Sequence, residues 1–223
     1  MPSIWRQIQR KNFTILKALS AFLEWDEKME EKALPRAPFT LNLPFRLASK
    51  IQKKTLNDPI LRQFLPIKEE NENKLGFVLD PVQDTTFIKE KKLLHKYEGR
   101  ALLVTSGACA MHCRYCFRKN FPYESIEKDF SKELKAIADD PSLQEILLSG
   151  GDPLSLSTSS LESLLTSLEK IPHIKRIRFH TRFPIGIPER LDEELLSLFA
   201  KVKKQLFFVV HINHVNELDQ EVL

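Results

Sequence analysis

The second half of the chain alternates short apolar runs with amphipathic segments, and this alternation restricts the fold more than any other feature. Between the runs lie segments with helical periodicity, with start signals at Ser131, Ser157 and Pro188. Runs this apolar are typical of strands covered on both faces, so we predict an α/β fold with a parallel sheet of about four βα units. The predicted strands are RALLVT (100–105), QEILLSG (144–150), IKRIRFHT (174–181) and QLFFVVHI (205–212), and the predicted helices cover 131–140, 157–171 and 188–202.

The first part of the chain has a different pattern. Apolar residues recur with helical spacing over residues 3–33 and stop at Pro35 and Pro38, which predicts one or two amphipathic helices. FRLASKIQK (45–53) and PILRQFLP (59–66) predict further short helices, and KEENENKLG (68–76) predicts a solvated charged loop. We therefore expect a helical N-terminal region over residues 1–95 and a core domain over residues 96–223.

The last predicted strand is followed only by NHVNELDQEVL. The fourth βα unit therefore consists of little more than its strand. This strand would be an apolar sheet edge with nothing beside it. Folded proteins avoid such edges. We therefore expect the core domain to be incomplete.

Composition excludes several classes of protein. The formal charge of +4 comes from 34 basic and 30 acidic residues scattered along the chain, which indicates no dedicated nucleic-acid surface. The N-terminus lacks the apolar stretch of a signal peptide, and no run approaches the roughly 18 apolar residues of a membrane span. Three clustered cysteines form a poor disulfide framework, so we expect a cytoplasmic protein with metal or redox chemistry.

All three cysteines, Cys109, Cys113 and Cys116, lie directly after the first predicted strand. A four-iron cluster suits this set, because three thiolates leave one iron open to a ligand. Two alternatives remain. The cysteines could bind a zinc ion with His112 as the fourth ligand, or they could be inert residues of the core. The polar stretches SGGDPLS, HTRFP and HINH follow the other three strands, and the carboxyl ends of parallel strands meet at one site.

The cysteine spacing, with the aromatic Tyr115 before the last cysteine, resembles the signature of radical S-adenosylmethionine enzymes. The longer stretch 93–123, together with LLSGGDPLSLS, RIRFHTRFPIGIPERL and HINHVNE, resembles the lysine 2,3-aminomutase family. Within that family, CRYCFRKNFPY (113–123) is more similar to the branch that supplies β-lysine for modification of elongation factor P. The resemblance implies a partial radical SAM (βα)6-type barrel that binds a [4Fe-4S] cluster, S-adenosyl-L-methionine and pyridoxal phosphate.

The resemblance also implies roles for individual residues. Gly150, Gly151 and Asp152 match the segment that meets the amino group of S-adenosylmethionine, the alternative being a glycine turn capped by Asp152. Arg118 matches the arginine that grips the substrate carboxylate, the alternative being a solvated basic pair with Lys119.

Lys96, Tyr97 and Arg100 match residues around the phosphate and ring of pyridoxal phosphate, although Arg100 would serve equally as a surface charge. At the ends of the third and fourth strands, the candidates to face the adenosine or the cluster are His180, Arg182, His211 and His214. His211 and Asn213 have the period-two spacing that places both on one face of a strand.

The reaction implied is conversion of L-lysine to (R)-β-lysine, in which the cluster reduces S-adenosylmethionine to give an adenosyl radical. The implied partners are L-lysine, an electron donor such as flavodoxin or ferredoxin and, indirectly, the ligase of the elongation factor P pathway. The family's pyridoxal-phosphate lysine lies beyond Leu223, so we expect this chain to be truncated and unable to complete the reaction alone. The alternatives are a radical enzyme without pyridoxal phosphate, such as a glycyl-radical activase, and a non-catalytic zinc-binding scaffold.

Overall fold

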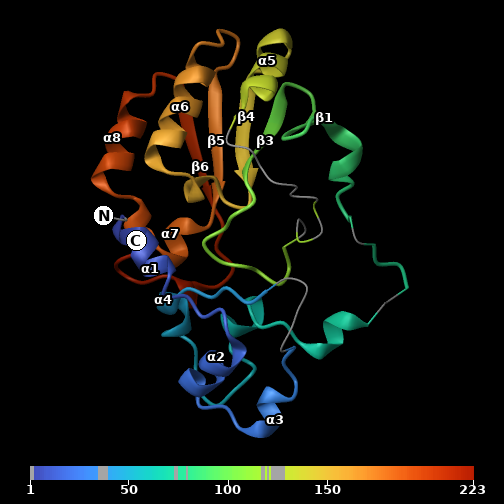
Figure 1. Ribbon diagram of the computed structural model, residues 1–223, viewed down its shortest axis with the longest axis vertical. Helices are drawn as coiled ribbons and strands as arrows, with labels where there is room; N and C mark the ends of the chain where they lie inside the picture. Colours follow the sequence, from blue (N-terminus) through green and yellow to red (C-terminus); the bar gives the residue numbers. More distant parts are fainter. Residues whose placement is uncertain are drawn as a thin grey trace.

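A six-stranded mixed sheet organises the molecule (Figure 1). The computed structural model describes residues 3–34, 40–72, 75–78, 80–116, 119, 121 and 129–223. Within these residues β1, β2 and β3 pair antiparallel, whereas β3, β4, β5 and β6 pair parallel, so the spatial order follows the chain. The strands are β1 (Ile88–Glu90), β2 (Leu93–Tyr97), β3 (Arg100–Ser106), β4 (Glu145–Gly150), β5 (Arg176–Thr181) and β6 (Gln205–Val210). The four predicted parallel strands and the α/β class are confirmed.

The three helices predicted between the parallel strands are present as α5 (Ser131–Asp139), α6 (Thr158–Glu169) and α8 (Glu193–Lys201). When parallel strands follow one another in sequential order, crossovers of the same hand place the connecting helices on one face of the sheet. Ser157 caps α6 as predicted, its Oγ accepting from the Ser160 amide at 3.2 Å. The predicted start of α8 at Pro188 is wrong, because Pro188 opens a separate 3-10 turn and Asp192 caps the helix. Between these elements lie the short turns η5 (Pro153–Ser155), α7 (Phe183–Gly186) and η6 (Pro188–Arg190).

The two faces of the parallel strands have different side chains, as the period of two requires. Leu103, Leu148 and Phe179 face the helices and are fully buried. Their neighbours Leu102, Leu147, Ser149 and His180 line a cavity on the opposite face. The sheet therefore has one packed face and one face available to a ligand.

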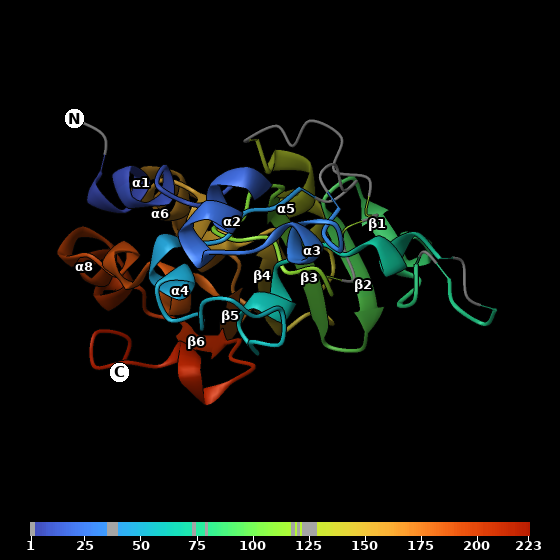
Figure 2. The same cartoon turned by 90° about the horizontal axis from the view of Figure 1, so that it is seen from below.

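The described residues before β1 form short helices and 3-10 turns, and they lie beyond the carboxyl ends of the parallel strands (Figures 1 and 2). The predicted helical region over 1–95 also contains β1 and the start of β2. Trp5 packs edge-on against Phe183 with ring centroids 5.5 Å apart, and both belong to one hydrophobic core shared with the sheet. The predicted helix over 59–66 is only a 3-10 turn, and another such turn occupies part of the predicted charged loop. The elements are α1 (Ile4–Gln9), α2 (Leu16–Leu23), α3 (Glu27–Glu30), α4 (Phe45–Ala48), η1 (Leu61–Gln63), η2 (Lys68–Asn71) and η3 (Asp84–Phe87).

The two edges of the sheet differ in how their strands are paired and covered. The sequence did not predict β1 and β2, which extend the sheet with antiparallel strands before the core. At the other edge, β6 pairs with β5 alone among the described strands, and Phe207, Phe208, Val209 and Val210 remain 38–45% exposed. An apolar edge strand is thus present, as its sequence predicted. In the described part of the chain, no helix has the length and apolar character needed to cross a bilayer.

Candidate functional site

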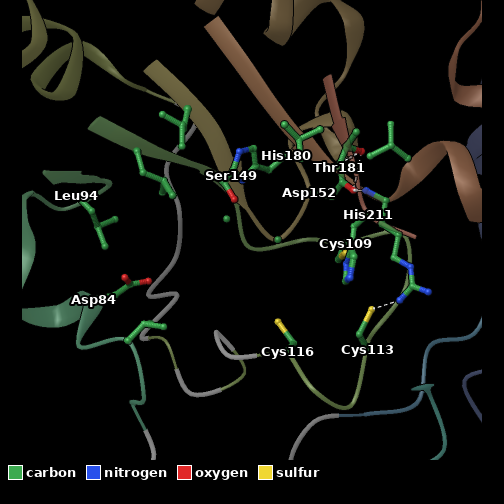
Figure 3. Close-up of a pocket in the computed structure, with 18 of the residues that line it drawn as sticks. Asp84, Leu94, Cys109, Cys113, Cys116, Ser149, Asp152, His180, Thr181 and His211 are labelled. Carbon is green, nitrogen blue, oxygen red and sulfur yellow. Dashed lines mark hydrogen bonds between the residues drawn. The ribbon is translucent and has the colours of Figure 1, made fainter. Parts of the chain in front are cut away.

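The three cysteines lie on a loop, residues 107–116, that follows β3 and contains no helix or strand. All three are free thiols, and all three line one cavity of about 1010 Å³ on the open face of the sheet (Figure 3). The same cavity is lined by residues at the ends of the next three strands: Gly150 at the end of β4 with Gly151 and Asp152 after it, Arg182 after β5, and His211 and Asn213 after β6. The polar stretches at the four strand ends therefore meet at one site.

The glycine turn after β4 packs against the start of the cysteine loop. The Gly151 amide donates to the Ser106 carbonyl at 2.7 Å, and the Asp152 amide donates to the Ala108 carbonyl at 2.9 Å. A Cβ at Gly151 would lie 2.2 Å from the Ala108 oxygen. At Gly150, φ is +114° and a Cβ would lie 2.5 Å from the Ser106 oxygen. Both positions require glycine because the backbone of the cysteine loop approaches so closely.

The Asp152 carboxylate is tied to the protein rather than free in the cavity. It accepts hydrogen bonds from the Leu154 amide at 3.0 Å, the Arg182 amide at 2.8 Å and the Thr181 hydroxyl at 2.8 and 2.9 Å. Burial raises the pKa of this carboxyl to about 6, although these hydrogen bonds act in the opposite direction. Asp152 thus links the end of β4 to the end of β5, the capping arrangement that the sequence analysis held as the alternative for this turn.

The N-terminal region supplies hydrogen bonds to the backbone of the cysteine loop. Asn12 Nδ2 donates to the Ala110 carbonyl at 2.8 Å, and Gln9 Nε2 donates to the Cys109 carbonyl at 3.3 Å. The loop amides of His112 and Arg114 donate to the carbonyls of Asn42 and Gln63, each at 2.9 Å. A segment without regular structure needs such partners for its backbone polar groups. The sequence of this region contains no motif that predicts a role at the site, because isolated polar residues have no recognisable pattern.

A buried polar network surrounds Cys113. Arg182 Nη1 donates to the Cys113 sulfur at 2.9 Å and also to the Tyr115 hydroxyl, while Nη2 donates to Glu217 Oε2 at 2.9 Å. Gln63 Nε2 donates to Glu217 Oε1 at 2.7 Å. Burial opposes the charge of Arg182, but the adjacent Cys113, Tyr115 and Glu217 outweigh it and raise the pKa of the guanidinium. Arg182 is among the residues that the sequence predicts for the site, whereas Gln63 and Glu217 belong to no motif and are not.

The candidates after β6 also meet this network. His211 Nε2 lies 2.8 Å from Asn213 Oδ1, and the His211 ring lies edge-on to Tyr115 with centroids 5.8 Å apart. Asn213 Nδ2 donates to the Tyr115 hydroxyl. His214 instead caps the following 3-10 turn, η7 (Val215–Glu217), and does not line the cavity. The period-two spacing of His211 and Asn213 thus does place them side by side.

The residues expected around pyridoxal phosphate lie at the opposite end of β3 from the cysteine loop. Lys96 and Arg100 line the same cavity; Lys96 Nζ donates to the Val82 carbonyl, and the Arg100 guanidinium lies 4.8 Å from the Tyr97 ring centroid. Arg100 and Ser106 are six positions apart along the strand, which is about 20 Å. The cavity therefore has thiols at one end and two cationic side chains at the other. Arg118 lies outside the described residues.

The thiols fit a cluster better than a single ion. Among the described residues, no three His, Cys, Asp or Glu side chains are grouped closely enough to hold one metal ion. A four-iron cluster needs less convergence, since each thiolate binds a different iron. His112 Nδ1 lies 2.8 Å from the Thr40 carbonyl, so this nitrogen is engaged away from the thiols. Arg182 Nε is buried and has no acceptor in the described part of the chain, an unmet donor that a bound anionic group would satisfy.

Comparison with known proteins agrees with this geometry. The family description "4Fe-4S single cluster domain" matches residues 98–204. L-lysine 2,3-aminomutase of Escherichia coli (strain K12) is 41% identical over 201 residues, which cover 89% of this chain and 58% of that protein. The enzyme of the same name from Haemophilus influenzae is 37% identical, over 92% of this chain and 61% of that protein.

A relative from Clostridium subterminale with the same name is 30% identical over 97% of this chain and 53% of its own length. The chain thus spans between about half and three fifths of these relatives. The similarity extends over almost all of the chain, including the N-terminal region, whose side chains donate hydrogen bonds to the cysteine loop. The chain is therefore homologous to L-lysine 2,3-aminomutases over most of its length, and residues 98–204 match the description of a 4Fe-4S single cluster domain.

Proposed function

We propose that this chain forms the cluster-binding and S-adenosylmethionine-binding part of an L-lysine 2,3-aminomutase. The observation that carries the proposal is the single cavity that brings three free thiols together with the glycine turn after β4 and with the cationic residues Lys96 and Arg100. When bound, a four-iron cluster would supply the electron that splits S-adenosylmethionine, and pyridoxal phosphate would hold the amine of L-lysine.

The chain's own residues have separate tasks in this proposal. Cys109, Cys113 and Cys116 hold the cluster, and Gly150 and Gly151 keep the loop that carries them in place. Desolvation, together with the charge of Asp152, raises the pKa of the Cys109 thiol, so metal binding must displace a proton there. In this proposal Lys96 and Arg100 attract a phosphate at the far end of the cavity, and Arg118 pairs with the substrate carboxylate.

The Asp152 carboxylate already accepts hydrogen bonds from three donors, which makes it a less available partner for an ammonium group than its sequence suggested. In our proposal the backbone of the glycine turn, rather than this carboxylate alone, meets the methionine part of the ligand. Supply of (R)-β-lysine for elongation factor P is the finer part of the proposal, and the resemblance of residues 113–123 supports it.

Anaerobic reconstitution with iron and sulfide tests the cluster. We expect about four irons per chain, a paramagnetic signal after reduction, and a change in that signal when S-adenosylmethionine is added. Cys113→Ala should lose the four-iron cluster. His112→Ala should keep it, whereas a zinc site with His112 as ligand would lose its metal in that variant.

Activity is measured separately. Formation of β-lysine from L-lysine, with reductant and both organic cofactors present, tests whether these 223 residues suffice for the whole reaction. A chain that binds four irons but never responds to S-adenosylmethionine would refute the proposal. The role in elongation factor P modification is tested by mass spectrometry of elongation factor P from cells that lack this protein. The proposal predicts that the added mass of β-lysine is missing.

A further inference from the structure

Arg182 is a charged side chain that contacts Cys113, one of the three thiols assigned to the cluster, and it has no role in the proposed function. It follows β5 directly, and its side chain is only 4% exposed. Its Nη1 lies 2.9 Å from the Cys113 sulfur, and Figure 3 draws this contact as a dashed line. The contact links the end of one strand to a loop residue 69 positions earlier.

Other residues fix the guanidinium in this orientation. Nη2 donates to Glu217 Oε2 at 2.9 Å and to Gln63 Oε1 at 2.5 Å. The Phe64 ring lies against it, with the guanidinium carbon 5.2 Å from the ring centroid. Glu217 is in turn fully buried and is held by the amides of Asn213 and His214, at 3.3 and 3.0 Å. Contacts from two separate segments, residues 63–64 and Glu217, therefore hold the guanidinium with one nitrogen directed at the sulfur.

We propose that Arg182 raises the reduction potential of the cluster by donating a hydrogen bond to the sulfur of Cys113. Reduction adds one electron and hence one negative charge to the cluster, and a buried cation with a hydrogen bond to a ligand sulfur stabilises that added charge. A guanidinium keeps its proton at every relevant pH, so the effect is constant. Arg182 is thus a positioning and tuning residue, and this inference rests on the proposed function because it requires the cluster.

The test is a redox titration of the reconstituted chain. The paramagnetic signal of the reduced cluster is measured at each potential, and the iron content is measured in parallel. In Arg182→Gln we expect the ratio of reduced to oxidised cluster at a fixed potential to fall about tenfold, which corresponds to a potential lower by about 59 mV. Arg182→Lys keeps the charge but not the forked geometry, so we expect a smaller shift in the same direction.

Two further variants make the result interpretable. Arg182→Gln combined with Glu217→Gln removes both buried charges together, which avoids leaving a carboxylate unpaired. This double variant should also have a lowered potential, but the shift should be smaller because a nearby negative charge is removed as well. Arg178→Gln is the matched control, because Arg178 lies on the same strand and pairs with Glu145 at 2.5 Å instead. It is four residues from Arg182, about 13 Å along the strand, and its potential should equal that of the wild type.

The outcomes separate this inference from the proposed function. A wild-type chain that takes up no iron would refute the proposed function and this inference with it. A wild-type cluster whose potential is unchanged in Arg182→Gln and in the double variant would refute this inference alone. Loss of the cluster or of the fold in every Arg182 variant, while Arg178→Gln retains both, would make Arg182 a purely structural residue and would also overturn the proposal.

Discussion

Gly151→Ala should detach the cysteine loop from the sheet. The added methyl carbon would lie 2.2 Å from the Ala108 oxygen and 2.7 Å from the Ala108 carbonyl carbon, whereas contacts below 3.0 Å are essentially never observed. The loop must therefore move by roughly 0.8 Å, the difference between 3.0 and 2.2 Å, immediately before Cys109. Three hydrogen bonds span the same junction. The Gly151 amide donates to the Ser106 carbonyl at 2.7 Å, and the Asp152 amide and the Ser155 hydroxyl donate to the Ala108 carbonyl at 2.9 and 3.1 Å.

Overpacking of this kind costs about 1–3 kcal/mol, and each weakened hydrogen bond about 1 kcal/mol. We expect Gly151→Ala to lower the free energy of unfolding by about 2–5 kcal/mol in urea titrations of the metal-free chain and to reduce iron content after reconstitution. Gly99→Ala is the matched control, since Gly99 has φ of +72° but its nearest neighbour would be 4.0 Å away. That variant should lose about 1 kcal/mol from backbone strain and bind iron normally. A Gly151→Ala chain within about 0.5 kcal/mol of the wild type, with full iron content, would refute this reasoning.

Two further predictions concern buried carboxylates. Because burial raises the pKa of Asp152 to about 6, the folded metal-free chain binds this proton more tightly than the unfolded chain, and stability should fall by at most about 3 kcal/mol as the pH rises from about 4 to about 6. Urea titrations across this range should show a steeper fall for the wild type than for Asp152→Asn; equal slopes would contradict it. Glu217→Ala leaves the Arg182 guanidinium buried without its counterion and should cost about 3–5 kcal/mol in the same assay. Glu221→Ala, which removes an exposed partner of Arg46, should cost less than about 1 kcal/mol, and similar losses in both variants would argue against a buried ion pair.

The parallel part of the sheet could be predicted from the sequence because each strand is an apolar run and each connecting helix has a 3.6-residue period. That the three cysteines lie together after β3 could be predicted because their spacing and their place after the first strand are local properties. β1 could not, since a strand of three residues, Ile88–Glu90, is too short to show a period. The start of α8 was misplaced because proline favours the first position of a 3-10 turn as well as that of an α-helix.

The support of the cysteine loop could not be predicted for a different reason. Gln63 and Arg182 are 119 positions apart, and Asn12 and Ala110 are 98 apart. Neither Gln63 nor Asn12 belongs to a motif, and a single amide side chain has no periodicity to read. Asp152 shows the converse case: its motif was recognised, but the motif does not reveal that the carboxylate is used between β4 and β5.

The loop that carries the thiols has no regular structure of its own, so its conformation depends on two anchors that lie elsewhere in the chain. The glycine turn and the N-terminal amides hold its backbone, and these anchors lower the free energy needed to order the three thiols before metal binds. Weakening either anchor should therefore reduce unfolding free energy and iron content together. Arg182 differs because it contacts a sulfur atom rather than the backbone of the loop. In Arg182→Lys, which preserves the charge, the reduction potential should change even where the iron content does not, and this separation distinguishes a residue that tunes the cluster from one that only holds the loop.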